Sequence, residues 1–101
     1  MIVNKIPVFS VIIPLYNSEK HIKNTIQSVL NQTYDSWELI VVDDCSTDNS
    51  REIVREIERN DRRIRLITSD KNFGGPAKPR NIGIKSSQGK YIAFLDSDDI
   101  W

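Results

Sequence analysis

Apolar runs alternate with helix-like segments along this 101-residue chain, and that alternation constrains the fold more than any other feature. Four runs, rich in β-branched and aromatic side chains, have the length and composition of strands. They cover residues 8–13, 37–42, 64–67 and 90–95. Segments with helical spacing or helix-start residues lie between them, at residues 18–31, in a stretch ending near Asn60, and at residues 79–87. The chain is therefore predicted to fold in the order β-α-β-α-β-α-β.

Strands that alternate with helices predict right-handed crossover connections and a parallel sheet. Two of the strand segments, LIVV and YIAFL, are almost entirely apolar, which is typical of strands covered by helices on both faces. Trp37 and Phe94 are accordingly expected in the core. The fold class is thus predicted to be α/β, with three layers in the order α/β/α.

Local signals predict where several elements begin and end. Pro14 is expected to end the first strand, and Asn17 or Ser18 to cap the first helix. Pro79 suits the first turn of the third helix, and Gly89 suits the stop that follows it.

Composition narrows the classes of partner. Lys plus Arg equals Asp plus Glu at 14 each, so the net charge is zero and gives no support to nucleic-acid or acidic-membrane binding. Cys45 is the single cysteine, which excludes an internal disulfide and favours a reducing compartment. The apolar run near the N-terminus is too short for a signal peptide or a membrane span. A cytoplasmic location is expected.

Acidic residues follow two of the predicted strands. Asp43 and Asp44 come after the second strand, and Asp96, Asp98 and Asp99 after the fourth. Parallel strands point their carboxyl ends to one edge of the sheet, where open α/β sheets bind ligands. Five carboxylates on one edge repel each other unless a cation or ligand donors offset their charge.

The D-x-D pair formed by Asp96 and Asp98 suits a divalent cation. Mg²⁺ or Mn²⁺ typically takes one or two carboxylates and completes its shell with water and phosphate oxygens. Arg80 lies in the first turn of a predicted helix, where a cation opposes the helix dipole unless an anion is bound there. The residues therefore indicate a nucleoside diphosphate with a divalent metal.

Simpler readings stay open for each of these residues. Asp43 and Asp44 are also suited to capping the second helix, residues 96–99 to forming a solvated tail, and Arg80 to pairing with a surface acid. A dinucleotide-binding protein is disfavoured, because PLYNSE stands where G-x-G-x-x-G would follow the first strand.

Four segments together resemble the nucleotide-binding half of family 2 glycosyltransferases of the GT-A fold. They read SVIIPLYN, QTYDSWELIVVDDCSTDNS, GGPAKPRNIGI and GKYIAFLDSDDIW, in that order. The resemblance implies a Rossmann-like half-domain with strand order 3-2-1-4, in which residues 1–101 form a single domain that binds a nucleotide-diphospho-sugar and stops just after the D-x-D motif.

The resemblance also implies roles for individual residues. Tyr16 would stack on or line the base pocket, with Pro14 at its floor. Asp44 would accept a hydrogen bond from the base, Asp43 would support that turn, and Arg80 would approach the diphosphate. The metal, Mg²⁺ or Mn²⁺, would be bound by Asp98, with Asp96 sharing it or touching the ribose or the sugar.

Members of this family transfer a sugar from a nucleotide donor, here expected to be a UDP-sugar, to an acceptor hydroxyl, usually with inversion. The acceptor would be a glycan or a lipid-linked glycan, which would place the enzyme at the inner face of a membrane. The catalytic base is expected beyond Trp101, so a non-catalytic nucleotide-binding module is the alternative function. The fourth strand would form an exposed edge through which two copies could associate.

Cys45 departs from the family pattern, which usually has glycine at this position. The turn after Asp44 is therefore expected to need a different backbone angle.

Overall fold

The computed structural model describes residues 7–34, 36–69 and 77–101. The strands are β1 (Phe9–Leu15), β2 (Trp37–Asp44), β3 (Ile64–Ser69) and β4 (Tyr91–Phe94), and the helices are α1 (Ile22–Leu30), α2 (Ser50–Asn60) and α3 (Ala77–Ser86). This is the predicted order of elements. The loop predicted before the third helix lies largely outside the described residues.

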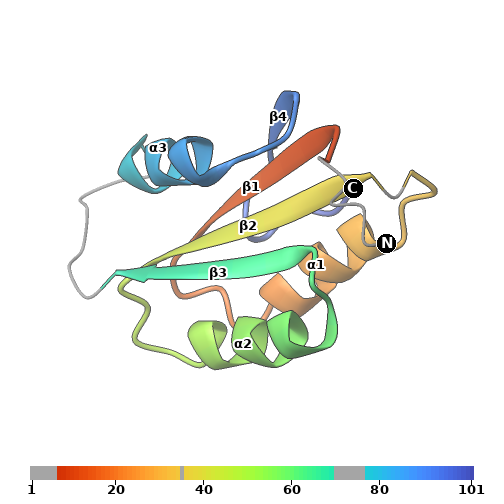
Figure 1. Cartoon of the computed structure of the whole chain (residues 1–101). Coiled ribbons are helices and arrows are strands. Elements are labelled where there is room, and N and C mark those ends of the chain that lie inside the picture. The colour runs from red at the N-terminus through yellow and green to blue at the C-terminus, as the bar shows by residue number, and fades with distance from the viewer. Residues whose placement is uncertain (1–6, 35, 70–76) are drawn as a thin grey trace.

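The four strands form one parallel sheet in the order β3-β2-β1-β4, as expected. Helices α1 and α2 cover one face and α3 covers the other, so the domain has the predicted three layers (Figure 1). No helix among the described residues has both the length and the apolar character needed to cross a membrane.

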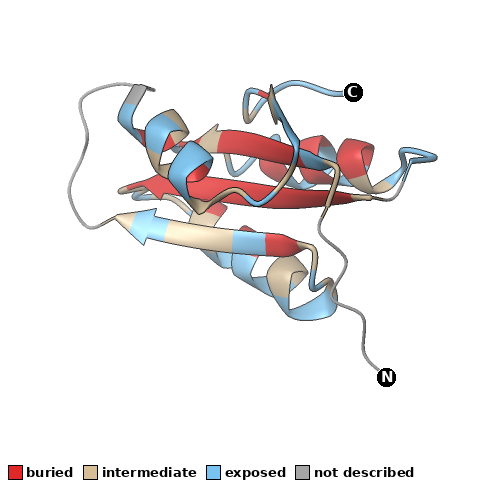
Figure 2. Ribbon diagram, turned by 45° about the horizontal axis from the view of Figure 1, so that its top comes forward, coloured by how far each residue is buried: buried red, intermediate tan, exposed pale blue. Residues whose placement is uncertain are grey.

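The main core lies between the sheet and the helices α1 and α2. Alternate residues of β1 point into it, and every residue of β2 is buried, so β2 appears as a continuous red strand in Figure 2. The largest core cluster joins buried residues of β1, β2 and both helices, among them Val11, Ile13, Ile26, Leu39 and Val54. The intervening residues of β1 point toward α3.

Helix α3 packs closely on β1 because Gly83 has no side chain. A Cβ atom at this position would lie 2.5 Å from Cγ2 of Ile12, which is too close for any real contact. The sequence NIG within α3 therefore brings the helix backbone onto the strand. This contact positions the start of α3, where Arg80 lies.

The prediction that Pro14 ends the first strand is wrong. Pro14 lies within β1 and pairs in register with Val42 of β2. Strand β4 pairs with β1 only as far as Ile12, so Pro14 has a neighbouring strand on one side only. Proline is tolerated at such edge-like positions, because its missing N–H group has no ladder partner to lose there.

The prediction that Phe94 belongs to the core is also wrong, as is the expectation that helices cover both faces of the fourth strand. Phe94 is 46% exposed, and Tyr91 and Ile92 of the same strand are exposed as well. The cause is tertiary, because α3 packs on β1 and β2 while β4 stands at the edge of the sheet. Trp37, in contrast, is buried as predicted.

Candidate functional site

The residues predicted to form the site come together at the carboxyl edge of the sheet. Tyr16 follows β1, Asp43 and Asp44 are the last residues of β2, and Asp96 and Asp98 follow β4. Strands β2, β1 and β4 are neighbours in the sheet, so three separate segments of the chain meet at this edge.

Asp43 is fully buried and is held by a basic side chain that the sequence did not single out. Arg51, in the first turn of α2, donates to Asp43 Oδ2 from Nε at 2.9 Å and from Nη2 at 2.7 Å. The backbone N–H of Ser46 donates to the same oxygen at 3.2 Å. Asp43 thus fastens the turn after β2 to α2 rather than facing solvent, and its Oδ1 is buried with no hydrogen-bond partner.

Cys45 adopts a left-handed backbone conformation, with φ of 58°. This is the region that favours glycine, so the turn after Asp44 keeps the glycine-type angle although a cysteine occupies the position. The expectation of a different backbone angle here is therefore wrong. The neighbouring Asp44, at the end of β2, is buried, with only 7% of its surface exposed.

Asn17 joins the loop after β1 to the loop after β2. Its Oδ1 accepts hydrogen bonds from the backbone N–H of Thr47 at 2.8 Å and of Asp48 at 3.3 Å, and its own N–H donates to Ser46 Oγ at 3.1 Å. Asn17 also has a positive φ of 45°, which asparagine tolerates better than most residues. It is not a helix cap.

The prediction of Asn17 or Ser18 as the cap of the first helix is accordingly wrong, because α1 begins later. The N-cap residue is His21, whose side chain makes no capping hydrogen bond. The carbonyl of Ser18 accepts from the N–H groups of His21 and Ile22 and closes a turn before the helix. The side chains of both predicted caps are used in contacts between loops instead.

Asp48 adds a second connection between these loops. It accepts hydrogen bonds from the N–H of Glu19 at 3.2 Å and of Ser50 at 2.9 Å. Partial burial raises the pKa of Asp48, but the hydrogen bonds from Ser50 and Glu19 outweigh this effect and hold the pKa below its ordinary value. Asp48 and Asn17 also line a shallow pocket of about 270 Å³ between the loops.

Tyr16 and Pro14, the two residues predicted to line a base pocket, differ in their exposure. The Tyr16 side chain is half exposed and open to a ligand. Pro14, inside β1, is only partly accessible. Pro14 lies in β1 and Tyr16 directly after it, and β1 stands between β2 and β4 in the sheet.

Arg80 pairs with the first carboxylate of the D-x-D motif. Arg80 Nη2 lies 3.5 Å from Asp96 Oδ1, and the guanidinium group lies 5.6 Å from the centre of the Phe94 ring. The side chains of Arg80 and Asp96 are 40% and 61% exposed, so solvent screens this ion pair and its contribution to stability is small. Pairing with a surface acid is the alternative left open for Arg80, and here the acid is itself a predicted site residue.

Asp96 and Asp98 fit a divalent cation by their chemistry. Both are exposed carboxylates in a segment whose middle residue, Ser97, is partly buried. Within residues 7–34, 36–69 and 77–101, no three His, Cys, Asp or Glu side chains are grouped closely enough to hold a metal ion alone. A cation that takes only one or two carboxylates from the protein, as Mg²⁺ or Mn²⁺ typically does, would suit these two side chains.

The sequence did not predict the contacts of three hydroxyl residues near the site, of which only Ser18 had been named, as a helix cap. Ser18, Thr25 and Ser28 all contact the segment that follows β4. In the sequence they look like ordinary uncharged polar residues in and just before the first predicted helix. A spacing of three residues between Thr25 and Ser28, on the same face as apolar core positions, is the signal that could have drawn attention to them.

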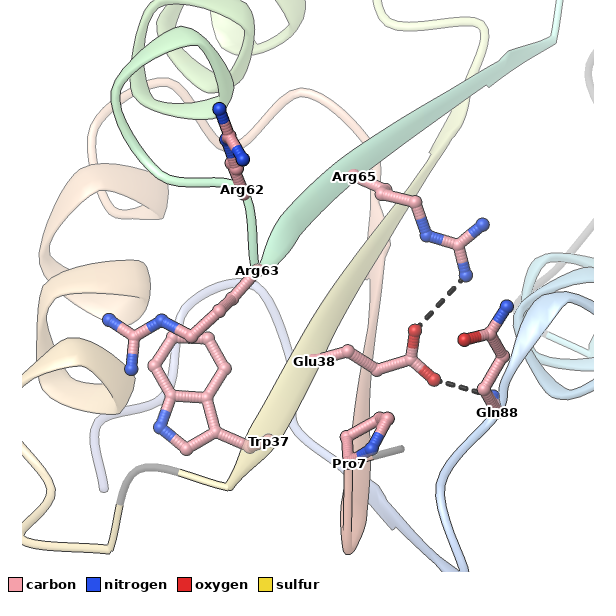
Figure 3. Close-up of a pocket in the computed structure, with 7 residues that line it drawn as sticks. All are labelled: Pro7, Trp37, Glu38, Arg62, Arg63, Arg65 and Gln88. Carbon is pink, nitrogen blue, oxygen red and sulfur yellow. Dashed lines mark hydrogen bonds and ion pairs between the residues drawn. The ribbon is translucent and has the colours of Figure 1, made fainter. Parts of the chain in front are cut away.

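A different pocket lies at the opposite edge of the sheet (Figure 3). It has a volume of about 300 Å³ and is lined by Pro7, Trp37, Glu38, Arg62, Arg63, Arg65 and Gln88. Glu38 is buried and accepts hydrogen bonds from Ser10 Oγ at 2.6 Å, the Gln88 N–H at 2.5 Å and Arg65 Nη2 at 3.2 Å. This buried acid, also missed in the sequence, ties β1, β2, β3 and the approach to β4 together. The pocket is therefore the surface of a structural polar network.

The architecture and the acidic carboxyl edge define the class as α/β proteins that bind ligands at the ends of parallel strands. Residues 10–101 match glycosyl transferase family 2, and the chain belongs to this family. It is 50% identical over 92 residues to the UDP-Glc:alpha-D-GlcNAc-diphosphoundecaprenol beta-1,3-glucosyltransferase WfgD of Escherichia coli. The match covers 91% of this chain and 35% of WfgD.

Solved structures support the GT-A fold. Residues 1–349 of Staphylococcus aureus TarS, crystallised with UDP-GlcNAc, superpose with a TM-score of 0.85 at 45% identity, over 91% of this chain and 27% of that 1–349 fragment. The mannosyltransferase PcManGT of Pyrobaculum calidifontis, in complex with GDP-Man and Mn²⁺, gives a TM-score of 0.85 at 26% identity, over 94% and 28% of the two chains. The chain spans 35% to 37% of the length of three curated relatives.

Proposed function

We propose that this chain is the donor-binding part of a glycosyltransferase that binds a nucleoside-diphosphate sugar together with Mg²⁺ or Mn²⁺. The observation that carries the proposal is the juxtaposition at one sheet edge of two exposed carboxylates, Asp96 and Asp98, with the cationic side chain of Arg80. A metal–diphosphate ligand is complementary to this arrangement, because its cation can bind the carboxylates and its phosphates can pair with the guanidinium group. Two structural neighbours were solved in complex with ligands of this class, one with UDP-GlcNAc and the other with GDP-Man and Mn²⁺.

Each side chain has a role that its placement allows. The exposed ring of Tyr16 stacks on or lines the side of the base, with Pro14 beneath. Asp44 accepts a hydrogen bond from the base, and the buried Asp43 holds the turn that presents Asp44. Arg80 leaves Asp96 and pairs with the diphosphate, since the exposed ion pair is weak enough to exchange.

Asp98 is the proposed direct ligand of the cation, and Asp96 either shares it or contacts the ribose or the sugar. When bound, the metal neutralises the diphosphate charge that develops as the sugar leaves. We propose a UDP-sugar rather than a GDP-sugar as the donor, because over the matched residues the neighbour with UDP-GlcNAc is 45% identical to this chain and the neighbour with GDP-Man is 26% identical.

The whole protein would transfer the sugar, with inversion, to a hydroxyl of a glycan or a lipid-linked glycan. The name of WfgD, which specifies a diphosphoundecaprenol-linked acceptor, supports the lipid-linked case. Such an acceptor would place the enzyme at the inner face of a membrane.

Calorimetric titration with UDP, in Mn²⁺ and again in excess chelator, tests the proposal. We expect binding to be clearly tighter with Mn²⁺. Asp98→Asn should reduce the increase in UDP affinity that Mn²⁺ causes by roughly tenfold or more. The reason is that losing a direct metal ligand costs at least as much affinity as losing a residue that supports one. Asp44→Ala should weaken UDP binding under both conditions and leave the dependence on Mn²⁺ in place.

Asp99→Asn is the matched control, because it removes the same charge from the same exposed segment. If Asp99→Asn and Asp98→Asn weaken binding equally, general acidity rather than the D-x-D pair attracts the cation. Equal affinity of the unaltered chain with and without Mn²⁺ would remove the metal from the proposal. UDP binding without sugar transfer in the whole protein would instead support a non-catalytic binding module.

A further inference from the structure

The D-x-D segment is attached to helix α1 through hydroxyl groups. The carbonyl of Ser97, the residue between the two carboxylates, accepts a hydrogen bond from Thr25 Oγ1 at 3.0 Å. Its hydroxyl lies 2.6 Å from Ser18 Oγ. Four residues later the N–H of Trp101 donates to Ser28 Oγ at 3.0 Å. The segment that follows β4 is therefore attached at Ser97 and at Trp101 to α1 and to the turn before it.

Thr25 and Ser28 lie on the buried side of α1, among side chains of the main core. A hydroxyl group in the middle of a helix commonly bonds to a carbonyl of the preceding turn. Ser28 does so, donating to the carbonyl of Thr25 at 2.6 Å. Thr25, whose side chain is fully buried, donates across to Ser97 instead. A buried hydroxyl is costly unless it is hydrogen-bonded, so the position of Ser97 satisfies Thr25.

This attachment decides which way the acidic segment presents its charges. The N–H of Asp99 donates to the carbonyl of Asp96 at 3.0 Å, so residues 96–99 form a tight turn. With Ser97 held inward by both its carbonyl and its hydroxyl, Asp96 and Asp98 on either side remain exposed. Ligands held in place by supporting hydrogen bonds bind a metal more tightly than ligands that must be ordered first.

We propose that Thr25, assisted by Ser18, is a positioning residue that sets the geometry of the Asp96–Asp98 pair for a divalent cation. The inference rests on the proposed function, because it assumes that this pair binds the metal. Thr25 acts through Ser97 and touches neither the metal nor the nucleotide.

The test compares Mn²⁺ affinity, in the presence of saturating UDP, among three variants and the unaltered chain. Electron paramagnetic resonance of free Mn²⁺ gives the affinity directly. Thr25→Val keeps the shape of the side chain and removes its hydroxyl, and we expect Mn²⁺ affinity to fall about tenfold. Thr25→Ser restores the hydroxyl and should restore the affinity. Ile26→Val, at the next position of the same helix, disturbs the core without touching the acidic segment.

A second measurement follows the segment without any metal. Trp101 is 47% exposed and Trp37 only 6% exposed, so quenching of tryptophan fluorescence by acrylamide reports mainly on Trp101. We expect stronger quenching in Thr25→Val than in Thr25→Ser, because the acidic segment loses its attachment to α1.

The outcomes separate the inference from the function on which it rests. Unchanged affinity and unchanged quenching in Thr25→Val would overturn the positioning role while leaving the metal site in place. An equal loss of affinity in Ile26→Val would also overturn it, because general destabilisation would then explain the effect. If the unaltered chain binds no Mn²⁺ with UDP, the proposed metal site fails and the inference fails with it.

Discussion

At the scale of single residues, the site depends on two side chains in unusual backbone conformations. Asn17 and Cys45 both have positive φ, and they lie at the starts of the two loops that meet beside the carboxylates. Asn17 offsets its strain with hydrogen bonds to the opposite loop. Cys45 occupies a turn whose shape is held by Asp43, through Ser46 and Arg51. The turn thus keeps its shape because neighbouring residues fix it, although cysteine does not favour the angle.

Replacing Cys45 by glycine should relieve this strain. We expect Cys45→Gly to be more stable than Cys45→Ala by about 0.5 to 1 kcal/mol, because both variants lose the thiol and only alanine keeps a Cβ atom in the left-handed region. Urea unfolding of the two variants gives the difference in the free energy of unfolding. Equal stabilities would show that the turn relaxes to another angle when the thiol is removed.

At the scale of elements, a short polar corner joins α2 to β3. Asp61, the C-cap residue of α2, accepts hydrogen bonds from the N–H of Arg63 at 2.9 Å and from its guanidinium Nη2 at 2.8 Å. The same guanidinium group lies 3.9 Å from the centre of the Trp37 ring. Glu58 accepts from the N–H of Leu66 at 2.7 Å. These contacts set where β3 enters the sheet, and hence its register against β2.

The Asp61 corner predicts a specific loss of stability in acid. Hydrogen bonds from the Arg63 side chain hold the pKa of Asp61 below its ordinary value. A carboxyl group with a lowered pKa in the folded state stabilises the fold above its unfolded pKa, near 4, and this contribution is lost as the pH falls through the lower folded pKa. The unaltered chain should therefore lose stability steadily as the pH falls below about 4.

Asp61→Asn should lose less stability over the same interval, because asparagine does not titrate. Urea midpoints measured at about pH 6 and at about pH 3 test this expectation. Glu56→Gln is the control, since it removes a carboxylate from the exposed ion pair with Arg59 on the same helix. An equal fall in the urea midpoint for Asp61→Asn and the unaltered chain would contradict the claim that Asp61 causes this loss of stability.

At the scale of the whole molecule, burial is distributed unevenly across the sheet. Strand β2, inside the sheet, is wholly buried (Figure 2). Strand β4, in contrast, exposes Tyr91, Ile92 and Phe94. Next to β4 the exposed rings of Phe9 and Tyr34 pack edge to face, with centroids 5.6 Å apart. Among the described residues no strand pairs with the outer side of β4. An apolar strand edge of this kind tends to pair with another chain.

We therefore predict that this 101-residue chain self-associates through β4. Light scattering coupled to size-exclusion chromatography should show a mass above that of the monomer, increasing with concentration. Ile92→Lys should shift the population to monomer, because lysine on an edge strand opposes strand pairing. Glu52→Lys, which places lysine on the exposed side of α2, should leave the association unchanged. A stable monomer at high concentration in the unaltered chain would show that β4 does not act as an edge.

The sequence by itself determined the order of elements, the parallel sheet and the edge at which the acidic residues collect. Periodicity and chain direction carry this information, because helical spacing and apolar runs depend on neighbours along the chain and parallel strands share one carboxyl edge. The strand order came from the resemblance to a family, and the structure confirms it.

Only the tertiary structure decided the partners of the polar side chains. The pairing of Asp43 with Arg51, the contacts of Asn17 with the opposite loop, and the bond from Thr25 to Ser97 all join segments whose proximity the local pattern does not encode. For the same reason Phe94, apolar and in a strand, is exposed, because α3 packs on other strands. A side chain's type limits what it can bind, but the distant segment that packs against it determines what it does bind.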